Sequence, residues 1–184
     1  LFISAVSSAG AQEKLVPDVW DIQLGMPVAD LPDREFVDPA CGTNGGPASR
    51  PLDSFADFAL CRKEDSGLHE VQFVYDDELE YWAKAIGDKS LIARYTGTGV
   101  MGHPAILSIL VDDAGLVQGI RIVTDPRADP MVRRGAFILR IRFKARFSVD
   151  GWNCVRLPRE EGEEPIAGRY EKDICTLEHG GDKR

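Results

Sequence analysis

The clearest pattern along the chain is a pair of apolar, β-rich runs separated by a short polar turn. The runs span 105–111 and 116–124, and the turn between them is Asp112-Asp113-Ala114-Gly115. Glycine tolerates the left-handed backbone conformation that short hairpin loops require. Alternating apolar residues on either side of such a turn are typical of two antiparallel strands. The pattern therefore predicts a hairpin at the centre of an antiparallel sheet.

Other segments alternate in the same way over a shorter length. Val71, Phe73 and Tyr75 fall on one face of a predicted strand over 69–75, because successive side chains of a strand point to opposite faces. The remaining predicted strands are 19–24, 91–96, 152–157 and 169–177, the last two paired with each other.

A helix is predicted to begin at Asp129-Pro130, which combines a favoured N-cap residue with proline at the first helical position. Residues 139–147 nevertheless also alternate strictly, as a strand would. The capping signal and the helix-forming side chains favour a helix, but the choice between helix and strand over 138–147 stays open here. The apolar stripe of the predicted helix is Val132, Ala136, Leu139, Phe143 and Phe147.

Two shorter segments also have helical spacing. Residues 77–86 follow an acidic cluster that complements a helix N-terminus, and they are predicted to be helical. Residues 54–61 fit a short helix or a short strand.

Together these elements predict an α+β fold. An antiparallel sheet with a central hairpin packs against one or two helices, and two disulfides hold the structure. Residues 12–177 are expected to form a single globular domain, and 178–184 a flexible polar tail.

The first eleven residues read as the end of a secretory signal peptide. An apolar run over 1–6 leads to Ala9-Gly10-Ala11, a small-residue triplet of the kind that signal peptidase accepts. We therefore expect residues 1–11 to be a signal remnant and the protein to be periplasmic or secreted in a bacterium. No other apolar run approaches the roughly 18 residues that a membrane span needs, so no transmembrane segment is expected.

Four cysteines agree with export, because an even number in an exported chain predicts disulfides. Pairing Cys41 with Cys61 and Cys154 with Cys175 is favoured among the three possible pairings, because each pair brackets a single supersecondary unit. A zinc site is disfavoured, since the chain has no C-x-x-C sequence and its histidines lie far from its cysteines. We expect no metal site.

Charge is distributed unevenly along the chain. The net charge of −8 argues against a nucleic-acid partner, because such binding needs many cations facing phosphate. The segment 126–147 reverses this balance, and Asp129 is its one acidic residue. Its basic residues are Arg127, Arg133, Arg134, Arg140, Arg142, Lys144 and Arg146.

Two interpretations of this basic segment stay open. The cations from Arg133 to Arg146 either pair with acidic regions of the same chain or form a binding face for an external partner. That partner would be an envelope protein or an anionic surface. The sequence does not indicate an oligomeric state.

Candidate catalytic groups are few. Asp76, Asp77 and Glu78 supply neighbouring carboxylates, and His103 follows a glycine-rich loop. Such groups act as general acids and bases when a cleft brings them together. The loop 97–102 has the glycine spacing of a dinucleotide-binding motif, but a β-rich run follows it where that motif needs a helix. No cofactor is therefore expected.

The sequence favours an exported, non-enzymatic envelope protein that binds a partner through its basic segment. The alternative is a small exported enzyme, such as a hydrolase, that uses carboxylates near 76–80 together with His103.

Overall fold

The computed structural model describes most of the chain between residues 19 and 183. The signal-like segment 1–11, the predicted strand 91–96 and the candidate carboxylates at 76–78 lie outside the described residues. The described residues are 19–32, 36–75, 82, 85–90, 99–101, 103–147, 150–163, 165, 172–179 and 182–183.

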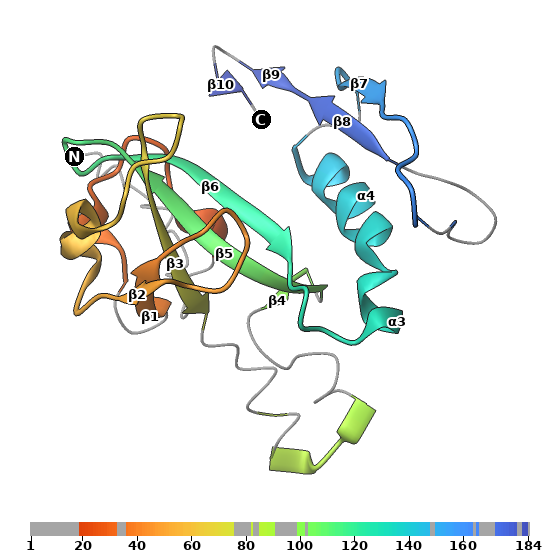
Figure 1. Ribbon diagram of the computed structural model, residues 1–184, viewed down its shortest axis with the longest axis horizontal. Helices are drawn as coiled ribbons and strands as arrows, with labels where there is room; N and C mark the ends of the chain where they lie inside the picture. The colour runs from red at the N-terminus through yellow and green to blue at the C-terminus, as the bar shows by residue number, and fades with distance from the viewer. Residues whose placement is uncertain are drawn as a thin grey trace, which may run out of the picture.

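An antiparallel sheet of six strands forms the centre of the molecule (Figure 1). Its strand order is β2-β1-β3-β5-β4, and β6 also pairs with β5. Together with the helices and disulfides described below, this sheet confirms the predicted α+β class. The strands are β1 (Phe36–Cys41), β2 (Arg50–Pro51), β3 (His69–Tyr75), β4 (Gly99–Val100), β5 (His103–Val111) and β6 (Val117–Thr124).

The predicted central hairpin is formed by β5 and β6. The two strands pair antiparallel, with Ser108 opposite Arg121. Gly115 in the turn has a φ of 77°, the left-handed conformation that glycine adopts without steric cost. A carboxylate oxygen of Asp112 accepts two backbone N–H groups of the turn, at 2.9 and 3.0 Å. These contacts explain why the sequence turns at this position.

One face of the sheet carries the hydrophobic core. Val71, Leu107 and Ile109 lie on adjacent strands and are fully buried. Three short 3-10 helices pack against this face, and each contributes a buried residue to the core. They are η1 (Val19–Asp21), η2 (Val28–Asp30) and η3 (Phe55–Leu60).

The prediction of a first strand over 19–24 is wrong. The segment begins with η1, and Val19 and Ile22, three positions apart, both lie in the core. This spacing fits a 3-10 turn, whereas strand alternation would place the two side chains on opposite faces. The N–H of Gly25 then donates to the carbonyl of Val117 at 2.7 Å, which holds the segment against the central hairpin.

The structure also describes the segment 54–61 and part of the predicted helix 77–86. Residues 54–61 take the helical alternative as η3, where Ser54 and Asp57 form a capping box. Of the predicted helix 77–86, the described residues Trp82, Ala85 and Ile86 are helical.

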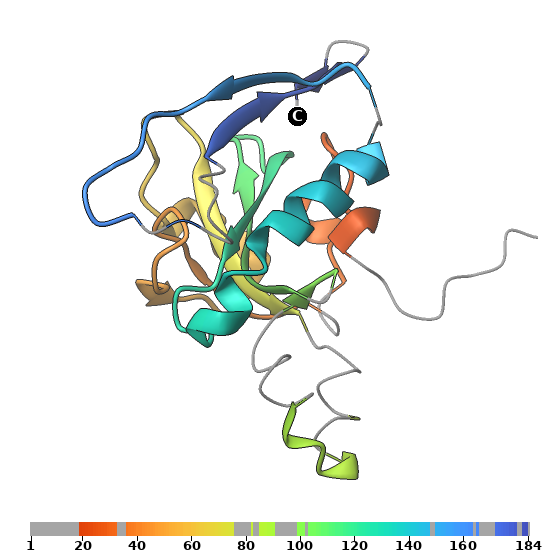
Figure 2. The same cartoon turned by 90° about the vertical axis from the view of Figure 1, so that its right-hand side faces the viewer.

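The chain after Asp129 is helical, as the capping signal indicates. It forms α3 (Pro130–Arg133) and α4 (Ala136–Phe147), separated by a short break. A carboxylate oxygen of Asp129 accepts the N–H of Met131 at 2.7 Å. Figure 2 shows α4 lying against the sheet beside β6. The apolar stripe of α4 is only half-buried, with Leu139 packed against the core, and no residue of α4 is fully buried.

A second hairpin, β7 (Asn153–Arg156) with β8 (Asp173–Thr176), lies beside α4 and confirms the predicted pairing. Cys154 and Cys175 are opposite each other in it and form a disulfide. The other disulfide, Cys41 to Cys61, joins β1 to the residue after η3. Both pairings predicted from the sequence are therefore confirmed.

Within the predicted tail, β9 (Glu178–His179) pairs with β10 (Asp182–Lys183). The mobility of this tail stays a prediction.

Candidate functional site

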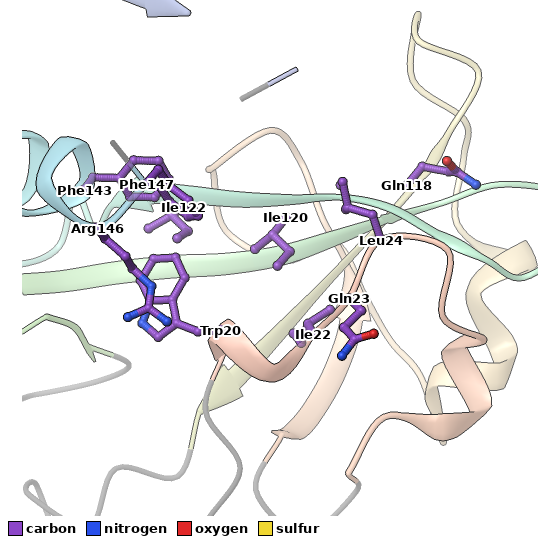
Figure 3. A pocket seen from close by; sticks show the side chains of 11 residues that line it. Trp20, Ile22, Gln23, Leu24, Gln118, Ile120, Ile122, Phe143, Arg146 and Phe147 are labelled. Carbon is purple, nitrogen blue, oxygen red and sulfur yellow. The ribbon is translucent and has the colours of Figure 1, made fainter. Parts of the chain in front are cut away.

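An elongated groove runs along the sheet between η1, β6 and α4 (Figure 3). Its volume is about 520 Å³, within the range of roughly 300–1,000 Å³ that small-molecule sites occupy. Ile120 and Ile122 of β6 lie along its length, and both are half-buried extensions of the core. Leu24 and Gln118 lie at the opposite end from Trp20 and Arg146. We call this space the α4–β6 groove.

Aromatic rings close one end of the α4–β6 groove. The ring centre of Trp20, from η1, lies 5.8 Å from the ring centres of both Phe143 and Phe147 on α4. The two phenylalanine rings are 4.6 Å apart. The guanidinium carbon of Arg146 lies 4.5 Å from the centre of the Trp20 ring, a cation–π contact. This end of the groove is therefore aromatic and cationic.

A second groove, of about 390 Å³, lies on the other side of α4. It shares Ile120, Ile122 and Phe143 with the first groove, and Trp152 and the Cys154–Cys175 disulfide border it. The helix thus stands over β6 with open space on both sides, because its half-buried stripe does not fill the surface beneath it.

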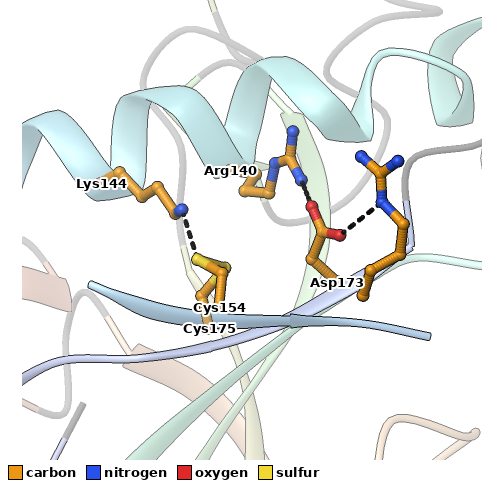
Figure 4. The surroundings of a disulfide bond; sticks show 6 residues. Arg140, Lys144, Cys154, Asp173 and Cys175 are labelled. Atoms are coloured by element: carbon orange, nitrogen blue, oxygen red, sulfur yellow. Dashed lines mark hydrogen bonds and ion pairs between the residues drawn. A yellow bond between two sulfur atoms is a disulfide. The ribbon is translucent and has the colours of Figure 1, made fainter.

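Two contacts join α4 to the β7–β8 hairpin (Figure 4). A guanidinium nitrogen of Arg140 donates to a carboxylate oxygen of Asp173 at 2.6 Å. The ammonium nitrogen of Lys144 lies 2.9 Å from Sγ of Cys154 and 5.6 Å from the ring centre of Trp152. The disulfide-linked hairpin therefore holds α4 through its contacts with Arg140 and Lys144.

Among the described residues, some cations of the basic segment pair with acidic residues of the same chain, and others do not. Arg127 and Arg140 pair with Asp125 and Asp173 of the same chain. Arg142 donates to the backbone carbonyl of Met101, while Lys144 and Arg146 contact sulfur and aromatic rings. Among the contacts of the described residues, these last three cations meet no carboxylate. Pairing with carboxylates of the same chain therefore explains Arg127 and Arg140 but not the other three cations.

The solvent side of α4 carries apolar as well as basic side chains. Phe137, Ile138 and Ile141 are 38%, 43% and 55% exposed. Arg142, also exposed, lies one helical turn after Ile138, and Arg134, exposed as well, lies in the short break just before α4. We call these five residues the outer face of α4. Arg133, at the end of α3, is also exposed.

The alternative catalytic set is only partly visible. Asp76, Asp77 and Glu78 lie outside the described residues. His103 itself is buried, and its Nε2 lies 3.1 Å from the hydroxyl oxygen of Thr124. Burial lowers the pKa of His103, which favours the neutral ring.

A buried ionic cluster lies on the sheet face opposite the core. Glu70 of β3 is 2% exposed, and one of its carboxylate oxygens lies 2.8 Å from the guanidinium of Arg121. The same oxygen accepts the N–H of Asn44 at 2.6 Å. Arg121 also pairs with Glu64, and this hydrogen bond lowers the pKa of Glu64 and raises that of Arg121.

No sequence pattern predicts this cluster of Glu70, Arg121 and Glu64. The local signal is a charged side chain, Arg121, between the two isoleucines of β6. Ser108, opposite Arg121, is also buried, and its hydroxyl has no hydrogen-bond partner in the described part of the chain.

No group of three or more His, Cys, Asp or Glu side chains among the described residues could hold a metal ion. No described helix is long and apolar enough to cross a membrane.

The chain matches no protein-family model, no curated protein and no solved structure.

Proposed function

We propose that the chain is an exported, non-enzymatic protein that binds an anionic lipid surface through the outer face of α4. The observation that carries this proposal is the exposure of Phe137, Ile138 and Ile141 on α4, with Arg142 on the same helix and Arg134 just before it. Helices that lie in a membrane interface combine apolar side chains, which enter the acyl boundary, with cations that meet lipid phosphates. The two disulfides support export, since disulfides persist in oxidising compartments.

Charge complementarity favours an anionic lipid surface over a neutral one. The whole chain has a net charge of −8, so it would be repelled by anions unless its cations were gathered on one face. Arg134 and Arg142 on the outer face, with Arg133 beside it, provide such a face. Each arginine near an anionic membrane contributes about 1 kcal/mol, and salt screens this attraction.

The test is co-sedimentation of the purified protein with vesicles. We expect binding to vesicles of mixed phosphatidylglycerol and phosphatidylcholine, weaker binding at raised salt, and no binding to phosphatidylcholine alone. Arg142→Gln should weaken binding about fivefold. Ile138→Ser with Ile141→Ser should weaken it roughly tenfold or more, because two apolar side chains no longer enter the interface.

A matched control comes from the β7–β8 hairpin. Val155 and Ile174 are each 59% exposed and lie opposite each other, away from α4's outer face. Val155→Ser with Ile174→Ser should leave vesicle binding unchanged. Equal losses in the two double variants, or equal binding to neutral and anionic vesicles, would reject the outer face as the lipid-binding site. Binding to an envelope protein but to no vesicle would also reject the proposal.

A further inference from the structure

The α4–β6 groove has an apolar floor that the described residues leave half-exposed. Ile120 and Ile122 belong to the row of side chains that forms the core, since they lie opposite Ile109 and Leu107 of β5. Leu107 and Ile109 are fully buried, whereas Ile120 and Ile122 are only half-buried. Apolar surface left open to water is unfavourable, and a ligand that covers it gains this free energy.

The shape and the charge of the groove together select its occupant. The space is elongated, with Trp20 and Arg146 at one end and Leu24 at the other, and the two isoleucines lie between them (Figure 3). A hydrocarbon chain fits such a floor better than a peptide segment, because peptide N–H and C=O groups buried there would need hydrogen-bond partners. The cation at one end complements an anionic group attached to that chain.

Arg146 is suited to bind such an anion. It is exposed in the last turn of α4, and its contact with Trp20 is with the face of the ring. The N–H donors of a guanidinium lie in its plane and match the geometry of carboxylate or phosphate oxygens.

We propose that the α4–β6 groove binds one anionic amphiphile, with its hydrocarbon chain over Ile120 and Ile122 and its anionic group at Arg146. The ligand is a long-chain carboxylate or a single-chain phospholipid, which share this chemistry. The inference goes beyond the proposed function, because it uses the inner side of α4 and β6 whereas the lipid surface meets the outer face. Either proposal can therefore fail without the other.

The binding test uses the delipidated protein without vesicles, at ligand concentrations below micelle formation. Hexadecanoate, lysophosphatidylglycerol and the uncharged hexadecanol are titrated separately by calorimetry. We expect saturable binding of at least one of the two anionic ligands, and weaker binding of the alcohol. Binding of hexadecanoate alone would assign the groove to free fatty acids, and binding of lysophosphatidylglycerol would extend it to phospholipids.

Two arginine variants separate the specific contact from general charge. Arg146→Gln should weaken binding of the anionic ligand about fivefold to tenfold and leave hexadecanol binding unchanged. Arg62→Gln removes the same charge at an exposed position outside the groove and outside the outer face of α4, and it should change neither. Equal effects of the two substitutions, or no saturable binding by the unaltered protein, would overturn the proposal.

Trp20 provides a second readout that reports position. A brominated fatty acid quenches the fluorescence of a tryptophan that it contacts, and the chain has 3 tryptophans. We expect strong quenching that Trp20→Phe largely removes. Quenching that Trp20→Phe leaves intact would place the ligand elsewhere and overturn the assignment. Ile122→Trp, which fills the groove, should abolish binding; if it does not fold, the arginine and tryptophan variants still decide the question.

Discussion

The guanidinium of Arg121 on β6 lies 2.8 Å from a carboxylate oxygen of Glu70 on β3, a side chain that is 2% exposed. The pair reaches diagonally across β5, since Arg121 lies opposite Ser108 whereas Glu70 lies opposite Leu110, two positions further along that strand. A buried carboxylate without a partner is costly, because the interior solvates its charge poorly. The fold of this sheet face therefore depends on one arginine that neutralises a buried acid.

Removing that arginine should destabilise the protein severely. Arg121→Leu leaves Glu70 buried and unpaired, and we expect the free energy of unfolding to fall by about 3–5 kcal/mol. Urea denaturation followed by circular dichroism measures this loss. Adding Glu70→Gln should restore part of the stability, because a neutral amide costs less to bury than a carboxylate.

An exposed ion pair provides the control for Arg121→Leu. Lys63 lies 2.7 Å from Asp113 at the surface, and pairs of this kind contribute little to stability. Lys63→Gln should therefore leave the urea midpoint almost unchanged. If Arg121→Leu were as mild as Lys63→Gln, Glu70 would not be a buried charge that needs a partner.

A second substitution tests how tightly Glu70 is held. A Cβ added at Gly42 would lie 2.4 Å from side-chain carbons of Glu70. Glu70 cannot move away without losing its contacts with Arg121 and Asn44. Gly42→Ala should therefore destabilise the protein by about 1–3 kcal/mol, as overpacking does in well-filled interiors. An unchanged urea midpoint would mean that the Glu70 side chain has room to shift.

These contacts show what a local pattern predicts and what it misses. The hairpin of β5 and β6 was predictable, because alternation and the Gly115 turn are both local signals. The prediction of a strand over 19–24 was wrong because the apolar residues there fit two patterns. Val19 and Ile22 have the three-residue spacing of a 3-10 turn, and they also lie in a short apolar run of the kind that a strand contains. Short segments do not separate these two periods.

The ionic cluster and the groove depend on information that no local pattern contains. Arg121 occupies a polar position of an alternating strand, which by itself predicts a solvent-facing side chain. Only the register across β3, β5 and β6 shows that it meets Glu70. Likewise, Trp20 and Phe143 are far apart in the sequence and become neighbours only because η1 and α4 pack beside β6.

The stability of the protein should also fall on mild acidification. The ordinary pKa of histidine is 6.5, and burial lowers the pKa of His103 below that value. The unfolded chain therefore takes up a proton at a higher pH than the folded chain does. The contribution of neutral His103 is present above pH 6.5 and is lost as the pH falls from there toward the folded pKa.

The substitution His103→Gln tests this dependence. We expect the urea midpoint of the unaltered protein to fall between pH 7.5 and 5.5, and the midpoint of His103→Gln to fall less. Further loss near pH 4 is expected in both proteins, because Arg121 and Arg127 lower the folded pKa values of Glu64 and Asp125. Parallel midpoint curves for the two proteins above pH 5.5 would show that His103 does not control this range.

The two disulfides should differ in what they contribute. Each closes a loop of similar length, with sequence separations of 20 and 21, which corresponds to about 3 kcal/mol from chain entropy. Cys41 and Cys61 are in addition buried in the core, whereas Cys154 is exposed on β7. Replacing the first pair by alanine therefore leaves a cavity as well as a longer unfolded chain.

We accordingly expect Cys41→Ala with Cys61→Ala to lower the free energy of unfolding more than Cys154→Ala with Cys175→Ala. Denaturation of the two double variants measures the difference, and thiol titration of the unreduced, denatured protein should detect no free cysteine. Two or more reactive thiols would contradict the pairing itself. A larger loss of stability from Cys154→Ala with Cys175→Ala would contradict this order. It would mean that the β7–β8 hairpin, through its contacts with Arg140 and Lys144, contributes more to stability than the buried disulfide does.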